Sequence, residues 1–240
     1  MENALYIGLS RQMVLRQNMN LVANNIANVN TPGYRADKML FEEYIVDPKP
    51  ANEELSMVLD YGQYKDTAQG KMSYTGNQLD VALQGPAFMM VETAQGTQYT
   101  RAGNFALNNN RELVNAEGYP VLDGGQGRIV FPENIREVTI TDNGQIASDQ
   151  GVIGQIGMVE FNNVNNLRPT GNGFYLAEND EIPLPAENTI MKQGMLEGSN
   201  VKAVLEMTDL IEISRDYQSM QRMLQNEHDR QRSTIQKLTE

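Results

Sequence analysis

Apolar side chains recur on one face of a predicted helix near the start of the chain, from about Asn3 to Asn28. Their heptad-like spacing places them on a single stripe when the backbone is helical. The members of this stripe are Leu5, Leu15, Met19, Val22 and Ile26. Proline and glycine then end the helix, because proline disfavours helical backbone at the residue before it and glycine permits positive φ. The predicted helix-terminating turn consists of Thr31, Pro32, Gly33 and Tyr34.

A second and longer helix is predicted at the other end of the chain, where Ser199 or Asn200 can cap it and Leu238 closes its pattern. Its apolar positions repeat at spacings of three and four residues. They are Leu210, Ile213, Tyr217, Met220 and Leu224. With a rise of 1.5 Å per residue, this helix is roughly 55 Å long. That length exceeds the diameter of a domain of this size, so we expect part of the helix to project.

Between the two helices, short apolar runs alternate with turn signals, a pattern that favours antiparallel hairpins. The runs occupy residues 80–83, 87–91, 105–107, 129–131, 138–140, 156–161 and 174–176. Residues that tolerate positive φ separate them at 108–110, 117–118, 123–125 and 142–144. We therefore expect an α+β fold, in which long N- and C-terminal helices form a coiled-coil-like stalk around a central all-β domain.

This interpretation divides the chain into four parts. We assign residues 1–35 to the first helix and its turn, 36–78 to an extended connector, 79–194 to the β domain and 195–240 to the last helix. Most of the glycines and prolines fall in the β part, whereas the last helix contains only Gly198 and no proline. The two ends are therefore the parts that best tolerate a long helix.

Charge and hydropathy limit the classes of partner. The chain has 240 residues, a hydrophobic fraction of 40% and a formal net charge of −12, so we expect no binding to nucleic acid or to an anionic membrane surface. No apolar run approaches the roughly 18 residues that a membrane span requires, and Arg11 interrupts the first apolar stretch. We therefore expect neither membrane insertion nor a cleaved signal peptide.

The composition also limits the chemistry. The chain has no cysteine and a single histidine, His228, which removes disulfides, thiolate nucleophiles and zinc sites of the usual kinds. A pair of carboxylates is the catalytic chemistry left open. The candidates, Asp80, Glu92, Asp123 and Glu160, have no motif around them, and we interpret them as solvated surface charges. We expect no enzyme activity, no metal and no cofactor.

Both apolar stripes need a partner surface, because burying one Leu, Ile or Met side chain contributes roughly 1.5 to 3 kcal/mol. The two helices could pair with each other, or copies of the chain could pack side by side. We favour assembly, because the second helix is too long for the first to cover. Asn24 and Asn25 suit a helix interior poorly and are candidates for intersubunit hydrogen bonds, while Asn28 fits a C-terminal cap. The predicted assembly interface comprises both stripes together with Asn24, Asn25 and Asn28.

Three segments resemble one known family. ANNIANVNTPGYR at residues 23–35 is similar to the signature of bacterial flagellar axial proteins, the rod and hook family. YTRAGNFALNNNRELVNAEGYPVL at residues 99–122 resembles the β-domain core of its rod members, and GMLEGSNVKAVLEMTDLIEISRDYQ at residues 194–218 resembles their C-terminal helix. The chain differs from the common rod pattern at residues 85–90 and beyond Tyr217.

The resemblance implies a structural subunit of the flagellar rod, of the proximal-rod type, with the distal-rod type as the alternative. In this family the terminal helices line the inner tube of a hollow shaft for motility, and the β domain lies outside them. The implied partners are other proximal and distal rod proteins, copies of the chain itself and the flagellar type III export apparatus. The implied location is the periplasmic rod of the basal body.

One alternative from a different class remains, a secreted β-sheet binding module. That interpretation explains residues 80–176 and leaves both terminal helices without a role. Deleting residues 1–35 distinguishes the two, because a binding module keeps its ligand and an axial protein loses assembly.

Overall fold

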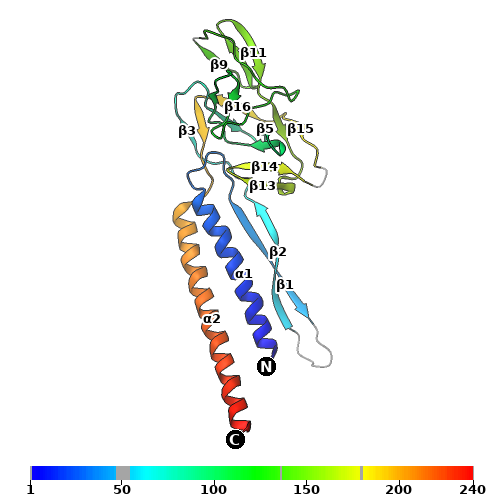
Figure 1. Ribbon diagram of the computed structural model, residues 1–240, viewed down its shortest axis with the longest axis vertical. Helices are drawn as coiled ribbons and strands as arrows, with labels where there is room; N and C mark the ends of the chain where they lie inside the picture. The colour runs from blue at the N-terminus through cyan, green and yellow to red at the C-terminus, as the bar shows by residue number, and fades with distance from the viewer. Residues whose placement is uncertain (1, 47–54, 136, 179–180, 240) are drawn as a thin grey trace. The chain divides into compact units, whose positions relative to one another are not determined.

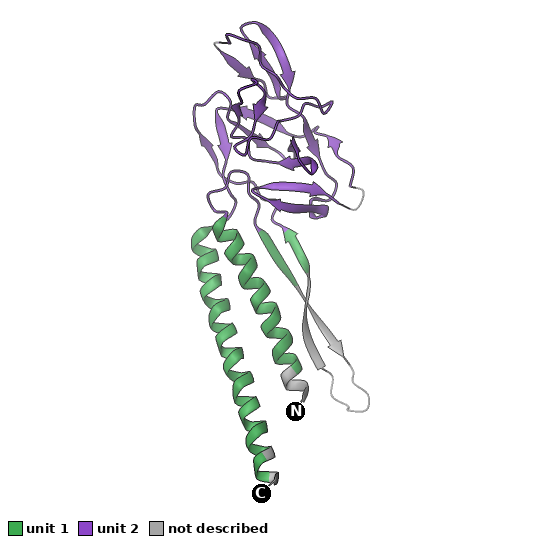
Figure 2. Cartoon of the chain, viewed as in Figure 1, with its two compact units in different colours: residues 1–27, 37–64, 202–240 green, residues 28–36, 65–201 purple. Residues whose placement is uncertain are grey.

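The computed structural model describes residues 2–46, 55–135, 137–178 and 181–239, and the chain forms two compact units (Figure 2). Unit 1 comprises residues 1–27, 37–64 and 202–240. Unit 2 comprises residues 28–36 and 65–201. The chain therefore enters unit 2, returns to unit 1, builds the rest of unit 2 and ends in unit 1.

Unit 1 contains two antiparallel helices and a two-stranded sheet (Figure 1). The helices are α1 (Glu2–Ala27) and α2 (Ala203–Thr239), and the strands are β1 (Asp37–Val46) and β2 (Leu55–Lys65). At 37 residues, α2 extends roughly 55 Å. Neither of the helices in the described part of the chain is both long and apolar enough to cross a membrane.

The turn after α1 belongs to unit 2, and its backbone conformation ends the helix. The Thr31 amide donates to the Asn28 carbonyl oxygen at 3.1 Å, and Gly33 has a φ of +68°. A β-carbon at position 33 would lie 2.5 Å from the carbonyl carbon of Arg101. Glycine is required here both for its backbone conformation and for the close approach of another segment.

Unit 2 is built from short strands whose described pairings are antiparallel. The largest sheet has the order β13-β14-β6-β5-β12-β15, and smaller sheets pair β11-β10-β9, β16-β4, β17-β3 and β7-β8. The strands of the largest sheet are β5 (Phe88–Thr93), β6 (Gly96–Thr100), β12 (Met158–Glu160), β13 (Leu167–Gly171), β14 (Phe174–Ala177) and β15 (Leu184–Pro185). The others are β3 (Met72–Tyr74), β4 (Val81–Gln84), β7 (Ala106–Leu107), β8 (Leu113–Val114), β9 (Val138–Ile140), β10 (Gln145–Ser148), β11 (Gly151–Gln155), β16 (Ile190–Gln193) and β17 (Met195–Glu197). A short 3-10 helix, η1 (Val164–Asn166), precedes β13.

Strand β5 of the largest sheet is buried on both faces. Along β5, Phe88 and Met90 belong to one apolar cluster, while Met89 and Val91 belong to another. Successive strand residues point to opposite faces, so these two clusters cover the two sides of the strand. This explains why the sequence of β5 reads as a continuous apolar run rather than as an alternating one.

The predicted fold class is wrong. The described chain contains two α-helices and is otherwise mainly strand, and it does not consist of a central all-β domain flanked by coiled-coil-like stalks. Unit 1 is mixed, because β1 and β2 accompany the helices and Met39 of β1 packs on their apolar cluster. The prediction failed because it treated the helix stripes as the sole apolar surface of this unit and assigned residues 37–64 to an extended connector.

Candidate assembly surface

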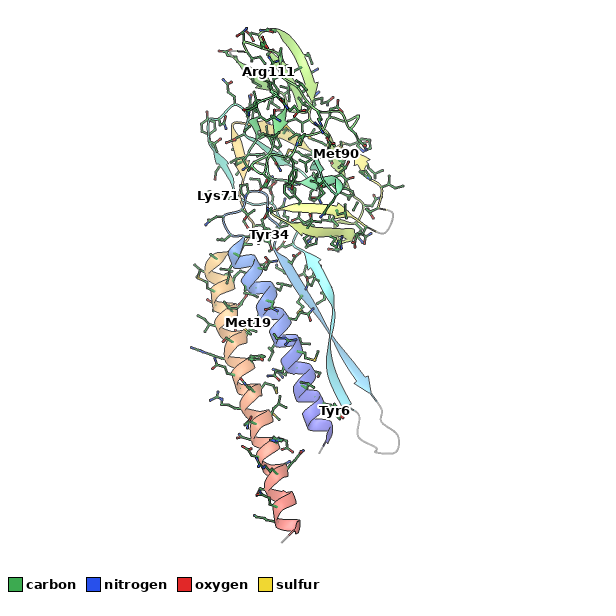
Figure 3. The ribbon with its side chains drawn as sticks, in the orientation of Figure 1. Tyr6, Met19, Tyr34, Lys71, Met90 and Arg111 are labelled. Carbon is green, nitrogen blue, oxygen red and sulfur yellow. The ribbon has the colours of Figure 1, made fainter. Side chains whose placement is uncertain are left out.

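Most of the predicted interface residues lie on facing sides of α1 and α2 within one chain. Val22 and Ile213 are 5% and 9% exposed and form a buried cluster with Leu21. Leu15, Met19, Ile26 and Leu210 are partly buried against this cluster. Met19 is labelled on α1 in Figure 3. The side chain of Leu5 lies outside the described residues.

The contact continues toward the start of α1, where Gly8 is buried against Leu224 and Met220 of α2. Tyr217, Met220 and Leu224 are each half-buried. Because residue numbers rise along α1 as they fall along α2, the helices run antiparallel. The pairing of the two stripes therefore covers these α2 side chains only in part.

The predicted asparagines have different environments. Asn25 is 2% exposed, and its side-chain amide forms two hydrogen bonds with the backbone of Asp37: Nδ2 donates to the carbonyl oxygen at 2.9 Å and Oδ1 accepts from the amide at 3.1 Å. Nδ2 also donates to Glu206 Oε2 at 3.2 Å. Asn24 is exposed, and Asn28 Oδ1 accepts from the Thr31 hydroxyl at 3.1 Å. Asn25 therefore fastens β1 and α2 to α1 within unit 1.

A groove runs between the two helices. Its volume is about 320 Å³, and its walls include Leu15, Val22 and Ile213 from the predicted stripes. Asp209, Glu212 and Asp216 line its α2 side. The groove thus combines apolar side chains with a row of carboxylates, which suits an apolar segment that carries basic residues.

Both helices also expose apolar side chains that the predicted interface did not include. We call Tyr6, Leu9 and Met13 the α1 patch; they are 60%, 50% and 55% exposed. We call Val204, Met207 and Ile211 the α2 patch; they are 76%, 51% and 54% exposed. Figure 3 shows Tyr6 near the start of α1. The signal in the sequence was their spacing of three and four residues, which forms a second apolar line on each helix.

The candidate catalytic carboxylates lie in separate hydrogen-bond networks of unit 2. Asp80 accepts from Thr75 Oγ1 at 2.7 Å, and Glu160 accepts from Thr189 Oγ1 at 2.9 Å. Asp123 Oδ1 accepts from two backbone amides of its own turn, and Glu92 pairs with Arg128 at 2.7 Å. Among the described residues, no group of three or more metal-ligating side chains is placed to hold a metal ion. His228 is exposed on α2.

A buried ion cluster that the sequence analysis missed holds the turn after α1 in unit 2. Glu197 of β17 accepts from Arg35 Nη2 and from Arg101 Nη2, each at 2.8 Å. The Gly33 amide donates to the Glu197 carbonyl oxygen at 2.8 Å. These residues are far apart in the sequence and form no motif, so only the folded chain shows that they belong together.

Three family profiles match the chain. The profile described as flagella basal body rod protein matches residues 5–35, and the flagellar hook protein FlgE/F/G D1 domain matches residues 82–148. The flagellar basal body rod FlgEFG protein C-terminal region matches residues 192–237. The different ending beyond Tyr217 therefore still falls within the matched C-terminal region.

Relatives match over nearly the whole chain. The flagellar basal-body rod protein FlgF of Caulobacter vibrioides is 36% identical over 99% of this chain and 98% of its own. FlgF of Mesorhizobium japonicum is 34% identical, with coverages of 91% and 90%, and the rod protein FlgG of Agrobacterium fabrum is 33% identical, with 90% and 91%. The chain belongs to the family of flagellar basal-body rod proteins, of the FlgF type. It is a structural subunit of the rod in the basal body of the bacterial flagellum, and its family implies assembly with other rod and hook proteins.

Proposed function

We propose that this chain is a non-catalytic subunit of the proximal rod that assembles through its terminal helices, with copies of itself and with neighbouring rod proteins, into a hollow drive shaft. The observation that carries the proposal is the apolar surface left open on both helices, the α1 and α2 patches. Residues 1–35 and 195–240 would form the inner-tube domain, and residues 79–194 the domain outside it.

The two patches lie at opposite ends of the helix pair. Gly8, within the α1 patch region, contacts Leu224, whereas Glu206, within the α2 patch region, contacts Asn25. At 1.5 Å per residue, the patches are roughly 25 Å apart along the helix axis. Surfaces that differ and lie apart favour head-to-tail contacts, which generate a filament when they do not close into a ring.

Burial of these patches gives assembly its driving force. Each large apolar side chain that becomes buried contributes roughly 1.5 to 3 kcal/mol. The interhelical groove adds a second contact, in which a neighbouring helix would place apolar residues against Leu15 and Val22 and basic residues against Asp209, Glu212 and Asp216. On this proposal the inward stripes order the helix pair, and the groove and patches bind the neighbours.

We also propose how the subunit is exported and where it functions. The subunit would leave the cytoplasm through the flagellar type III export apparatus, and it would function in the periplasmic rod. The absence of cysteine in the sequence fits a chain that is exported unfolded, because no disulfide has to form before or after passage.

The test compares a substitution at an exposed apolar position with one at a buried position two residues away. Ile211→Glu introduces a charge into the α2 patch, where the side chain is 54% exposed. We expect this variant to fold as the parent chain does and to fail to restore swimming in cells that lack the protein. Ile213→Asp and Ile26→Asp place a charge in or beside the buried cluster, so we expect them to weaken the helix pair as well as assembly.

Gln221→Glu is the matched control, since it adds the same charge at an exposed polar position of α2. Cells that carry this variant should swim. Normal swimming and a complete rod in cells that carry Ile211→Glu would refute the proposed role of the patches.

A further inference from the structure

Unit 2 contains a hollow that is smaller than the pockets of drug-sized ligands. Its volume is about 200 Å³, against roughly 300 Å³ or more for such pockets. Residues 93–95 line it from the turn between β5 and β6, and residues 170–172 line it from the β13–β14 hairpin, whose strands are labelled in Figure 1. Gln98, Tyr119 and Phe174 complete the lining. The hollow therefore has room for a ligand of about one ring.

The lining of this hollow is polar but neutral. Among the described residues that line it, none carries a charge. Its polar side chains are amides and hydroxyls, those of Gln95, Gln98, Asn172, Thr93, Thr170 and Tyr119. In a chain with 31 acidic and 19 basic residues, such a lining offers no counter-charge to an ion. The ligand that it suits is neutral and has several hydrogen-bonding groups.

Gln98 supplies an amide that is fixed before any ligand arrives. The residue is 4% exposed and pairs with Val91 across strands β6 and β5. Its Oε1 accepts from the Thr170 hydroxyl at 3.2 Å, and its Nε2 donates to Gln95 Oε1 at 3.3 Å. Within the described part of the chain, these bonds use one of two N–H groups and one of two lone pairs. The remaining donor and acceptor lie side by side, which suits a hydroxyl or an amide of a ligand.

Two aromatic rings form the apolar wall of the hollow. The Tyr119 and Phe174 rings meet edge to face, with centroids 5.8 Å apart and an angle of 82° between their planes. Phe174 is 6% exposed and Tyr119 is half-buried, so Tyr119 is the ring that a ligand can reach. Because Tyr119 packs against the buried cluster that contains Phe174, its ring is held in place. The hollow thus combines an apolar surface with hydrogen-bonding groups.

A sugar ring has the matching chemistry, because its C–H groups form apolar faces and its hydroxyl groups need donors and acceptors at the edge. We propose that this hollow binds one neutral sugar ring, whose hydroxyl or acetamido groups form hydrogen bonds with Gln98 and Asn172 and whose apolar face packs on Tyr119. A peptide segment would need an extended groove or a free strand edge rather than a compact hollow. The inference goes beyond the proposed function, because the lining residues all belong to unit 2.

The experiment titrates the full chain with N-acetylglucosamine and follows the backbone amide signals by NMR spectroscopy. We expect saturable shifts at Gln98, Tyr119 and Asn172, with a Kd of about 1 mM, because a single ring buries little surface. The linked trimer of the same sugar distinguishes two sources of the ring. Tighter binding of the trimer would indicate a unit within a glycan chain, and equal binding would indicate a free monosaccharide; both results support the site.

Asn172→Gly removes one amide and keeps the turn, because Asn172 has a φ of +51° and glycine adopts positive φ readily. We expect its Kd for N-acetylglucosamine to be about three- to tenfold weaker, the effect of one lost hydrogen bond. Tyr119→Leu removes the ring and keeps an apolar side chain, and it should weaken binding by about tenfold.

Asn134→Gly is the matched control. Asn134 is also an exposed asparagine with a positive φ, +61°, and it lies outside the hollow. This variant should bind N-acetylglucosamine as the parent chain does.

Three results would overturn the proposal: shifts that do not saturate, an unchanged Kd in Asn172→Gly, or equal weakening in Asn172→Gly and Asn134→Gly. An acetylated dipeptide amide that binds more tightly than the sugar would overturn the choice of ligand. Swimming of cells that carry Ile211→Glu is a separate measurement on the helices. Failure of the sugar site is therefore distinct from failure of the proposed function.

Discussion

Gly8 of α1 lies directly against Leu224 of α2: a β-carbon at position 8 would stand 2.8 Å from Leu224 Cδ2 and 3.5 Å from Met220 Sδ. This contact joins the first half of α1 to the second half of α2. It leaves room for no more than a small side chain on the inner face of α1.

We therefore expect Gly8→Ile to destabilise unit 1 by about 1 to 3 kcal/mol, because overpacking forces the helices apart or drives Leu224 from its rotamer. Gly8→Ala should change stability by less than about 1 kcal/mol, since the tip of Leu224 can move and alanine favours the helix. Chemical unfolding followed by circular dichroism measures both. Adding Leu224→Ala to Gly8→Ile should restore part of the loss, and no recovery in this double variant would show that the contact is not the cause.

The Asn25 side chain forms hydrogen bonds with both the amide and the carbonyl of Asp37, as the backbone of a neighbouring strand would. Asn25→Leu should cost about 1 to 3 kcal/mol, since it leaves these two backbone groups without their partner. Hydrogen exchange at the Asp37 amide should become faster than in the parent chain. Asn24→Leu, on the exposed side of the helix, serves as the comparison, and equal effects of the two variants would refute the role assigned to Asn25.

Gly33 lies in the turn after α1, and we expect that position to tolerate no side chain. In Gly33→Ala, the new β-carbon would lie 2.5 Å from the Arg101 carbonyl carbon and 2.8 Å from the Ala102 nitrogen, both of which are backbone atoms. Since backbone cannot rotate away as a side chain can, we expect a loss of more than about 3 kcal/mol.

Gly118→Ala is the comparison that separates the cost of a positive φ from the cost of the steric clash at position 33. Gly118 also has a positive φ, +85°, but a β-carbon there meets no atom within 4 Å. Gly118→Ala should therefore lose only about 1 kcal/mol of stability, from backbone strain. Equal losses at positions 33 and 118 would mean that the close approach to Arg101 contributes nothing.

Low pH should reduce the stability of unit 2, because it protonates carboxylates that the fold holds in their charged form. Hydrogen bonds from Asn108 and then Arg128 lower the pKa of Glu112 below its ordinary value of 4.5, and the Arg128 hydrogen bond lowers that of Glu92. A carboxyl whose pKa is lower in the folded state stabilises the fold above the unfolded pKa and loses this effect as pH falls through the folded pKa. The unfolding temperature should therefore drop as pH falls below about 4.5. Arg128→Met should reduce the steepness of that drop, and an unchanged slope would contradict the assignment.

The helices followed from the sequence because their signals are local. The expected first helix, about Asn3 to Asn28, agrees with α1 at Glu2–Ala27, since the apolar stripe and the Pro32-Gly33 pair fix its extent. The run at 138–140 coincides with β9, and the run at 87–91 overlaps β5. Repetition of apolar residues and the turn residues at the ends were sufficient in each case.

The remaining features depend on contacts that no short stretch of sequence encodes. In β1, Glu42 and Glu43 interrupt the apolar positions, so no alternating pattern marked the strand. The association of Arg35 and Arg101 with Glu197 joins residues brought together only by folding. The residues of the α1 and α2 patches are spaced three and four apart in the sequence. However, sequence alone does not tell which of two apolar lines on a helix faces its partner helix.

On the proposed function, the exposed apolar patches of the helix pair bind neighbouring rod subunits. The most direct measurement places a photoreactive amino acid at Ile211 and irradiates isolated basal bodies, with Gln221 as the control position. We predict adducts between this chain and another rod subunit, or a second copy, from position 211 and few from position 221. An assembled rod in which position 211 yields no such adduct would contradict the claim.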